Sequence, residues 1–382
     1  MIQLYKADNT NYEFNGDRII FPLLCQVRME LNGVWDLELE HPIDQEGVWQ
    51  LIVKEAVLSV PTTISKRQLY RIYSTVKTDD LVKAYARPIF FDAAHDVMLM
   101  NTVLAGKNGQ EALNIMTHGS RYQGVSDIIL AASSEYVRIN LIEALSGDGD
   151  QSFLNRWGGE IIYDNYKVII NKRVGGDHGV QIRTGKNLSG VKEEVHVDQI
   201  ITRIIPVAYN NYTLDGAQPW VDSPLIDNYP IIYTKVVKFE DIKLAEDAGN
   251  EEDGFETEEA LRAELIRRSQ MMYQAGADLP QISYDIDMIY LANTEDYKDF
   301  TTLEQIGLGD LVYCRHRGLD ITTSARAVAI EYDCIGQKVK HVSLGDIQYD
   351  YFKPSSSGLF SLIRYFHCAC NTGESVCPQQ PD

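Results

Sequence analysis

Apolar and polar residues alternate along the N-terminal part of the chain. Two alternating runs flank the dipeptide Asn32-Gly33, and their apolar positions are Val27, Met29, Leu31, Trp35, Leu37 and Leu39. A period of two is typical of β-strands that bury one face, and Asn-Gly favours a two-residue hairpin turn because both positions accept positive φ. Further β-branched runs lie at 56–60, 69–76 and 81–86. The pattern predicts an antiparallel barrel or sandwich as a first domain, over residues 1–102.

Helical spacing then replaces the alternation. Asn108-Gly-Gln-Glu111 resembles a capping box and precedes apolar residues that continue to Gly119, which predicts a short helix. Two more helical segments and two strands follow, at 141–147, from Ser152 onward, at 160–163 and at 166–171. Asp164-Asn165 favours a hairpin turn between the two strands. Together these elements predict a small α+β domain over residues 103–190.

The second half of the chain returns to β patterns around one helix. Strands at 200–209 and a loop rich in Pro and Asn at 210–230 predict that residues 191–240 complete the barrels. The acidic stretch 245–259 indicates a solvated loop, with a cation site as the alternative. Thr257 is a candidate N-cap for a helix with acidic residues in its first turn and arginines toward its end.

The remaining segments define the last expected domains. We expect the acidic loop, the helix and a β segment to form a domain over 241–307, followed by the last β-barrel portion over 308–352. Strands at 328–332 and 338–342 flank a turn at Ile335-Gly336. Residues 353–382 are expected to be a linker and an unassigned tail, because they lack any periodicity.

The charge and the N-terminal residues narrow the classes of function. The 55 acidic residues exceed the 35 basic ones and give a net charge of -20, which disfavours binding to a phosphate backbone. Neither a signal peptide nor a membrane anchor is apparent, so we expect synthesis in a cytoplasm. In that compartment Cys25, Cys314 and Cys334 are expected to be reduced and buried.

Three motifs contain residue types that can form binding sites, and each also has a simpler structural interpretation. Gly175-Gly-Asp-His-Gly179 could hold a metal or phosphate, but a plain turn is favoured. Cys368-Ala-Cys370 with Cys377 and His367 could bind zinc, but its spacing favours an unstructured tail. Trp157-Gly-Gly-Glu160 could be a sugar platform, but a Trp at such a junction is more often core.

No catalytic, cofactor-binding or metal-binding residues are therefore predicted. Gly307-Leu-Gly-Asp310 and Leu344-Gly-Asp346 are interpreted as strand connectors, because Gly-Asp after an apolar residue is ordinary turn chemistry. The histidines are scattered singly, without the paired spacing of a metalloprotease or the Gly-x-Ser-x-Gly of a hydrolase.

A set of motifs between Asn140 and Tyr209 carries a family resemblance. In order they are Leu141-Ile-Glu-Ala-Leu145, Gly147-Asp148, Ser152-Phe-Leu-Asn-Arg-Trp-Gly-Gly-Glu160, Asp164-Asn165, Gly185-Lys-Asn-Leu-Ser-Gly190 and Thr202-Arg-Ile-Ile-Pro206. In this order and spacing, the segment resembles the N-terminal region of phage minor structural proteins, the tail-associated lysin or endopeptidase-tail family of phages and prophages. Trp35 to Pro42 and Gly309 to Asp346 extend the likeness to about residues 1–352.

The resemblance implies both a fold and a role. The fold would be similar to the central baseplate hub protein of contractile tails. It would be mainly β with α+β insertions, comprising two tube-like β-barrel domains and two smaller α+β domains. The role would be a trimeric symmetry adaptor between the tail tube or distal tail protein and the tail tip, forming part of the channel for DNA and the tape measure. The location would be the distal tail tip of a virion, assembled in the host bacterial cytoplasm.

The implied partners are a homotrimer, the distal tail or tail tube protein, the tape measure protein, and receptor-binding or lysin components of the tip. Specific nucleic-acid binding, a membrane anchor and cofactors are not expected. Enzymatic activity is not expected either, since the chain ends soon after its last β segment without a lysin domain. Two alternatives stay open. One is a cell-wall hydrolase in which Glu160 or another carboxylate serves as the acid and a second carboxylate as the base or nucleophile. The other is a carbohydrate-binding module built on Trp157 or Trp220.

Overall fold

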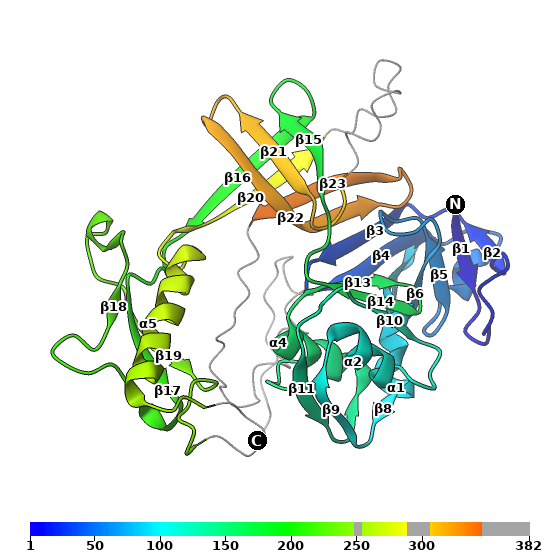
Figure 1. Ribbon diagram of the computed structural model, residues 1–382. Coiled ribbons are helices and arrows are strands. Elements are labelled where there is room, and N and C mark those ends of the chain that lie inside the picture. The colour runs from blue at the N-terminus through cyan, green and yellow to red at the C-terminus, as the bar shows by residue number, and fades with distance from the viewer. Residues whose placement is uncertain (248–253, 289–305, 346–382) are drawn as a thin grey trace, which may run out of the picture. The chain divides into compact units, whose positions relative to one another are not determined.

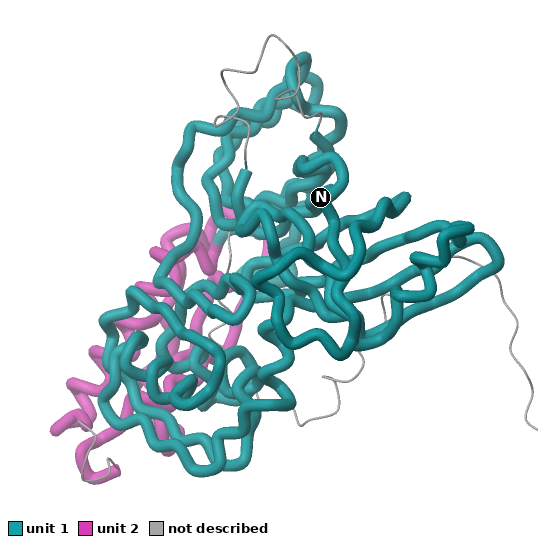
Figure 2. The backbone as a smooth tube through the Cα atoms, turned by 90° about the vertical axis from the view of Figure 1, so that its right-hand side faces the viewer, with its two compact units in different colours: residues 1–200, 279–347 teal, residues 201–278, 348–382 magenta. Residues whose placement is uncertain are grey.

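The computed structural model describes residues 1–247, 254–288 and 306–345. Among them, residues 1–200, 279–288 and 306–345 form one compact unit, and the described part of 201–278 forms another (Figure 2). The chain is mainly β with a few helices, as the sequence predicts. No helix in the described ranges is long and apolar enough to cross a membrane.

The first β module of unit 1 contains seven strands in the order β2-β1-β5-β6-β7-β4-β3, all antiparallel. Their bounds are β1 Ile2–Tyr5, β2 Arg18–Ile20, β3 Leu24–Glu30, β4 Trp35–Pro42, β5 Val57–Val60, β6 Gln68–Lys77 and β7 Leu81–Pro88. The two strands at the ends of this order, β2 and β3, are consecutive in the chain and joined by residues 21–23. The sheet must therefore curl so that its ends approach each other.

The predicted hairpin is confirmed as β3 and β4. Alternate residues of β4 are buried, including Trp35, Leu37 and Leu39. The turn differs from the prediction, because only Asn32 of the Asn-Gly pair has positive φ, at 54°. Its side chain explains the difference in part: Asn32 Nδ2 donates to Gly159 O at 2.9 Å, and Ile161 N donates to Asn32 Oδ1 at 2.9 Å. The turn is thus held by a later segment of the chain.

The second β module contains six strands in the order β15-β21-β22-β23-β20-β16. Their bounds are β15 Asp177–Arg183, β16 Leu188–His196, β20 Gln281–Met288, β21 Leu311–His316, β22 Ile321–Asp333 and β23 Lys338–Gly345. Here too the end strands, β15 and β16, are consecutive and joined by only residues 184–187. Asn187 lies at this seam and is 1% exposed. It accepts from Arg183 N at 3.1 Å and donates to Gln181 O at 3.0 Å.

One long strand joins the two modules. The first half of β22 pairs with β21 and its last residues pair with β3, so that blue β3 and orange β22 run side by side (Figure 1). Cys334 N donates to Cys25 O at 2.9 Å at the end of this pairing. Cys25, Cys314 and Cys334 are free and buried, as predicted. In neither module do the described strands close into a hydrogen-bonded barrel, because β2 does not pair with β3, nor β15 with β16.

An α+β segment follows the first module in the chain. Its helices are α1 Ala93–Asp96, α2 Gly109–Met116, α3 Leu141–Ser146 and α4 Phe153–Trp157, with the 3-10 turns η1 Val48–Leu51 and η2 Ile89–Asp92 before them. Its strands are β8 Met98–Leu99, β9 Thr102–Lys107, β10 Gln123–Val125, β11 Ala132–Tyr136, β12 Ile139–Asn140, β13 Glu160–Asp164 and β14 Lys167–Asn171. The predicted capping box is confirmed, since Asn108 and Glu111 each accept a hydrogen bond from the other's backbone N–H.

Unit 2 is a small sheet with one helix. Its elements are β17 Arg203–Ala208, η3 Tyr209–Asn211, β18 Val221–Asp222, η4 Ile226–Asn228, β19 Thr234–Phe239 and α5 Glu258–Gln274. The strands lie in the order β18-β17-β19, and Leu261 and Leu265 of α5 share a core with Ile204 and Val237. The predicted N-cap is confirmed, because Thr257 Oγ1 accepts from Ala260 N at 3.2 Å.

Several sequence predictions lie partly or wholly outside the described residues. These are the middle of the acidic stretch 245–259, Asp346, the linker at 353–358 and the cysteine-rich segment that contains Cys368, Cys370 and Cys377.

Candidate functional site

The most elaborate polar cluster of unit 1 lies where the α+β segment meets the second β module. At its centre Arg326 of β22 forms a bidentate ion pair with Glu160 of β13, with Nη1 to Oε1 at 2.6 Å and Nη2 to Oε2 at 2.7 Å. The Glu160 side chain is 2% exposed and that of Arg326 is 13% exposed. A buried pair of this kind is tolerated only where further hydrogen bonds satisfy the remaining donors and acceptors.

Those additional hydrogen bonds come from two backbone segments. Arg326 donates to Val174 O at 2.9 Å and to Gly309 O at 3.1 Å, and Val174 N donates to Glu160 Oε2 at 2.7 Å. The ion pair therefore joins the strand β13, the connection before β15 and the loop before β21. We call Glu160, Val174–Gly176, Gly307–Asp310 and Arg326 the junction cluster.

Asp310 provides the second carboxylate of the junction cluster. It is 5% exposed and accepts from Gly176 N at 2.8 Å and from Gly307 N at 2.7 Å. His178 Nε2 lies 3.5 Å from Asp310 Oδ1. Both carboxylate oxygens thus serve to fix backbone amides, which is a structural use of the charge.

Two glycines permit the backbones to meet. Gly175 and Gly309 have φ of +72° and +85°, a region that side chains rarely adopt. A Cβ on Gly175 would lie 2.2 Å from the Gly309 carbonyl carbon, and a Cβ on Gly309 would lie 2.6 Å from Val174 O. Both segments are strand connections, as predicted, although residues 177–179 of the expected turn belong to β15. The sequence did not indicate that the two connections contact each other or Glu160.

This geometry removes Glu160 from the carboxylates that the hydrolase alternative could use as its acid. Both oxygens of Glu160 are held by Arg326, so the carboxyl has no free position from which to protonate a substrate. The part of the chain that the structure describes holds no group of three or more His, Cys, Asp or Glu side chains suited to a metal ion.

Trp157 is buried, as predicted, and cannot present its ring as a platform. It is 3% exposed, its Nε1 donates to Lys107 O at 2.7 Å, and its ring stacks on Phe153 with centroids 4.9 Å apart. Gly159 has φ of +106° and leaves room for Asn171 O, which a Cβ would approach to 3.0 Å. Trp220, the other candidate platform, lies under the Arg203 guanidinium at 4.4 Å.

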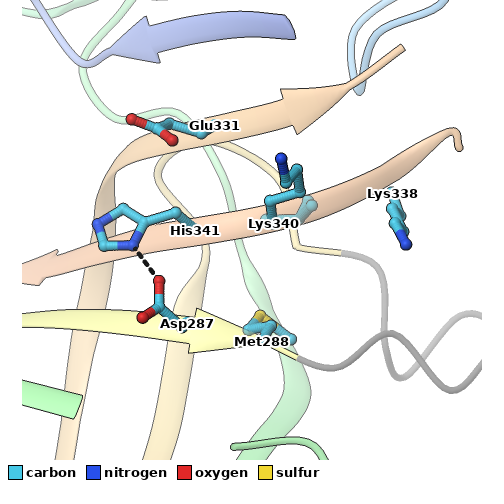
Figure 3. Close-up of a pocket in the computed structure, with 7 residues that line it drawn as sticks. Asp287, Met288, Glu331, Lys338, Lys340 and His341 are labelled. Carbon is cyan, nitrogen blue, oxygen red and sulfur yellow. Dashed lines mark hydrogen bonds and ion pairs between the residues drawn. The ribbon is translucent and has the colours of Figure 1, made fainter. Parts of the chain in front are cut away.

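A shallow pocket on the second β module was not predicted. It is lined by Asp287, Met288, Glu331, Lys338, Val339, Lys340 and His341. Figure 3 shows His341 turned toward Asp287, with Nδ1 to Oδ1 at 3.0 Å. These two residues are partners in the β20–β23 register. The lining mixes both signs of charge and so favours no single class of ligand.

Comparisons with known proteins find similarity to prophage tail proteins. Residues 176–350 match the family described as Prophage endopeptidase tail. A search of curated proteins found no match. Among solved structures, the prophage tail protein gp18 from Listeria monocytogenes is similar, with a TM-score of 0.57 and 14% identity over 91% of this chain and 95% of that one.

Two further structures have the same likeness. The 43 kDa tail protein of prophage MuSo2 from Shewanella oneidensis has a TM-score of 0.58 and 10% identity, covering 92% of this chain and 98% of that one. A tail protein from Neisseria meningitidis has a TM-score of 0.57 and 8% identity, covering 91% and 96%. The family resemblance inferred from the sequence is thereby confirmed: residues 176–350 match the prophage endopeptidase tail family, and the fold of the chain is similar to that of prophage tail proteins.

Proposed function

We propose that this chain is a structural subunit of a phage tail or phage-tail-like particle, and that three copies form a ring at the distal tail tip. The ring would adapt the symmetry of the tail tube or distal tail protein to that of the tip, and would enclose part of the channel for DNA and the tape measure protein. Receptor-binding or lysin components would attach to the tip.

The observation that carries this proposal is the pair of curled β modules. In each, the first and last strands of the sheet order are consecutive in the chain and joined by a few residues, and β3–β22 pairing links the modules. With two tube-like modules in each chain, a trimer would contain six such modules. The ring could then present a face of pseudo-sixfold symmetry to a tail tube. The α+β segment and unit 2 would then be the two smaller domains.

The proposed role is not enzymatic. Glu160 and Asp310 hold backbone segments together and Trp157 is part of the core, so these three residues already have structural partners. A zymogram with peptidoglycan tests this part directly. A cleared band from the purified chain would contradict it.

The mass of the particle in solution tests the ring. Light scattering of the purified chain, alone and with its distal tail protein, should give a trimer in at least one condition. Contacts in a closed ring are heterologous, with one surface of each copy meeting a different surface of the next. A monomer in both conditions, even at high concentration, would overturn the proposal.

A further inference from the structure

We propose that an arginine cluster at one end of the second β module docks against a carboxylate cluster at one end of the first β module of a second copy. The arginine cluster is Arg183, Arg315 and Arg317, and the carboxylate cluster is Glu46, Asp79 and Asp80. This inference rests on the ring proposed above and names the contact that would close it.

The arginine cluster is held together by the parallel pairing of β15 and β21. Arg183 and Arg315 are direct partners in the register, and Thr184 N donates to Arg315 O at 3.1 Å. Arg317 follows in the next turn, where its N–H donates to Thr184 Oγ1 at 3.3 Å. All three arginines are exposed. The two turns lie at the upper end of this module in Figure 1.

Placing like charges side by side on neighbouring strands costs stability. Within the described ranges, none of the three arginines forms an ion pair that would offset this cost, and Asp320 in the same β21–β22 turn does not pair with them. Guanidinium groups bind carboxylates through two parallel hydrogen bonds. Adjacent arginines of this kind therefore suit a partner that brings several carboxylates close together.

The first β module offers such a group of carboxylates. Asp79 and Asp80 form the turn between β6 and β7, and Ile43 N donates to Asp80 O at 2.9 Å, which holds this turn beside the segment that carries Glu46. The three carboxylates are exposed and form no ion pair with a described residue. The nearby cation Lys77 lies over the Trp49 ring at 5.2 Å.

The charge of the whole chain favours a second copy as the occupant. At a net charge of -20, copies repel each other unless their contacts place cations opposite acids. Neither cluster is neutralised by a residue in the described ranges, and the two carry opposite charge. A nucleic acid is a poorer occupant, because three phosphate contacts provide weak binding that the remaining acidic surface opposes.

Charge reversal provides the test. The double variant R183E/R315E should weaken self-association of the full chain at least about tenfold, as loss of close charge pairs at an interface does. The matched control is K54E/K66E, which makes the same change in net charge at two exposed lysines of the first module. Adding D79K/D80K to R183E/R315E should restore association, because the two clusters exchange their signs. Thermal unfolding of each variant establishes that it is folded.

Sedimentation of all four proteins in low and high salt separates the outcomes. Association of the unaltered chain should weaken as salt is raised. If R183E/R315E associates as well as K54E/K66E, or if D79K/D80K restores nothing, the docking inference is wrong and the ring stands. If R183E/R315E loses binding to the distal tail protein and keeps self-association, the inference is also wrong. An unaltered chain that stays monomeric both alone and with the distal tail protein overturns both proposals.

Discussion

Arg326 holds Glu160 in a buried bidentate ion pair although the two residues are 166 positions apart in sequence. The same guanidinium binds the carbonyls of Val174 and Gly309, so one side chain connects four segments. Because β13 belongs to the α+β segment and β22 to the second β module, this residue makes the two parts of unit 1 depend on each other.

Removing one partner of this pair should be costly. Arg326→Ala leaves a buried carboxylate without its cation and takes a donor from two backbone carbonyls, and should lower the free energy of unfolding by about 3–5 kcal/mol. Urea unfolding at neutral pH measures the loss. Arg173→Ala, which truncates an exposed arginine next to Val174, is the control and should change stability by less than about 0.5 kcal/mol. A loss of unfolding free energy for Arg326→Ala no larger than that of the control would show that the pair contributes no stability.

The close approach of Gly175 and Gly309 gives a second prediction. Gly175→Ala should destabilise the fold by more than about 1 kcal/mol, because it combines a positive φ with a clash against the backbone of Gly309. Gly185→Ala isolates the effect of φ, since Gly185 has φ of +80° and nothing within 4 Å of the added Cβ. Thermal unfolding should therefore show a clearly larger loss for Gly175→Ala. Equal losses would mean that the backbones separate without cost.

Local signals in the sequence predicted local structure well. Asn108 and Glu111 are three residues apart and form the capping box that their spacing indicates, and the Asn32 turn joins the strands that alternate on either side of it. The capping box depends only on neighbours in sequence, which is why a pattern is enough to find it. The Asn32 turn is also held by Gly159 and Ile161, and its backbone conformation differs from the predicted one.

The candidate site was not predictable in the same way. The partnership of Glu160 with Arg326, and that of His341 with Asp287, depend on which distant strands lie side by side and in which register. Parallel pairing of β15 with β21 joins segments more than a hundred residues apart, and the sequence pattern of neither strand identifies the other as its partner. The sequence indicates that Gly175 and Gly309 lie in turns, but nothing in either segment indicates that the two turns contact each other.

Burial of Trp157 leads to a third prediction. Trp157→Ala should cost about 3–5 kcal/mol, because a large aromatic is lost from the core together with its stacking on Phe153. Trp157→Phe keeps most of the apolar volume and should cost less, although the hydrogen bond to Lys107 O is lost. Urea unfolding of both variants decides the order. A loss no larger for Ala than for Phe would contradict the core role of this residue.

The last prediction concerns pH and rests on Asp36 of β4. Burial raises the pKa of Asp36 from 3.8 to about 6, although a hydrogen bond from Tyr73 and the charge of Arg87 act to lower it. Tyr73 Oη donates to Asp36 Oδ2 at 3.0 Å, and the Arg87 guanidinium lies 4.4 Å from the Tyr73 ring centroid. The folded state therefore retains this proton at pH values where the unfolded chain has released it.

The sign of the effect follows from linkage. Since the pKa of Asp36 is higher in the folded state, the stability that this group contributes is fully present below pH 3.8 and is lost as pH rises toward about 6. Asp36→Asn cannot titrate, so the difference in unfolding free energy between the unaltered chain and this variant should fall across that window and become flat above it. Comparing the two proteins removes the contribution of every other titrating group. Urea unfolding at half-unit pH steps measures the difference, and a difference that stays constant or rises with pH would show that burial does not raise the pKa of Asp36.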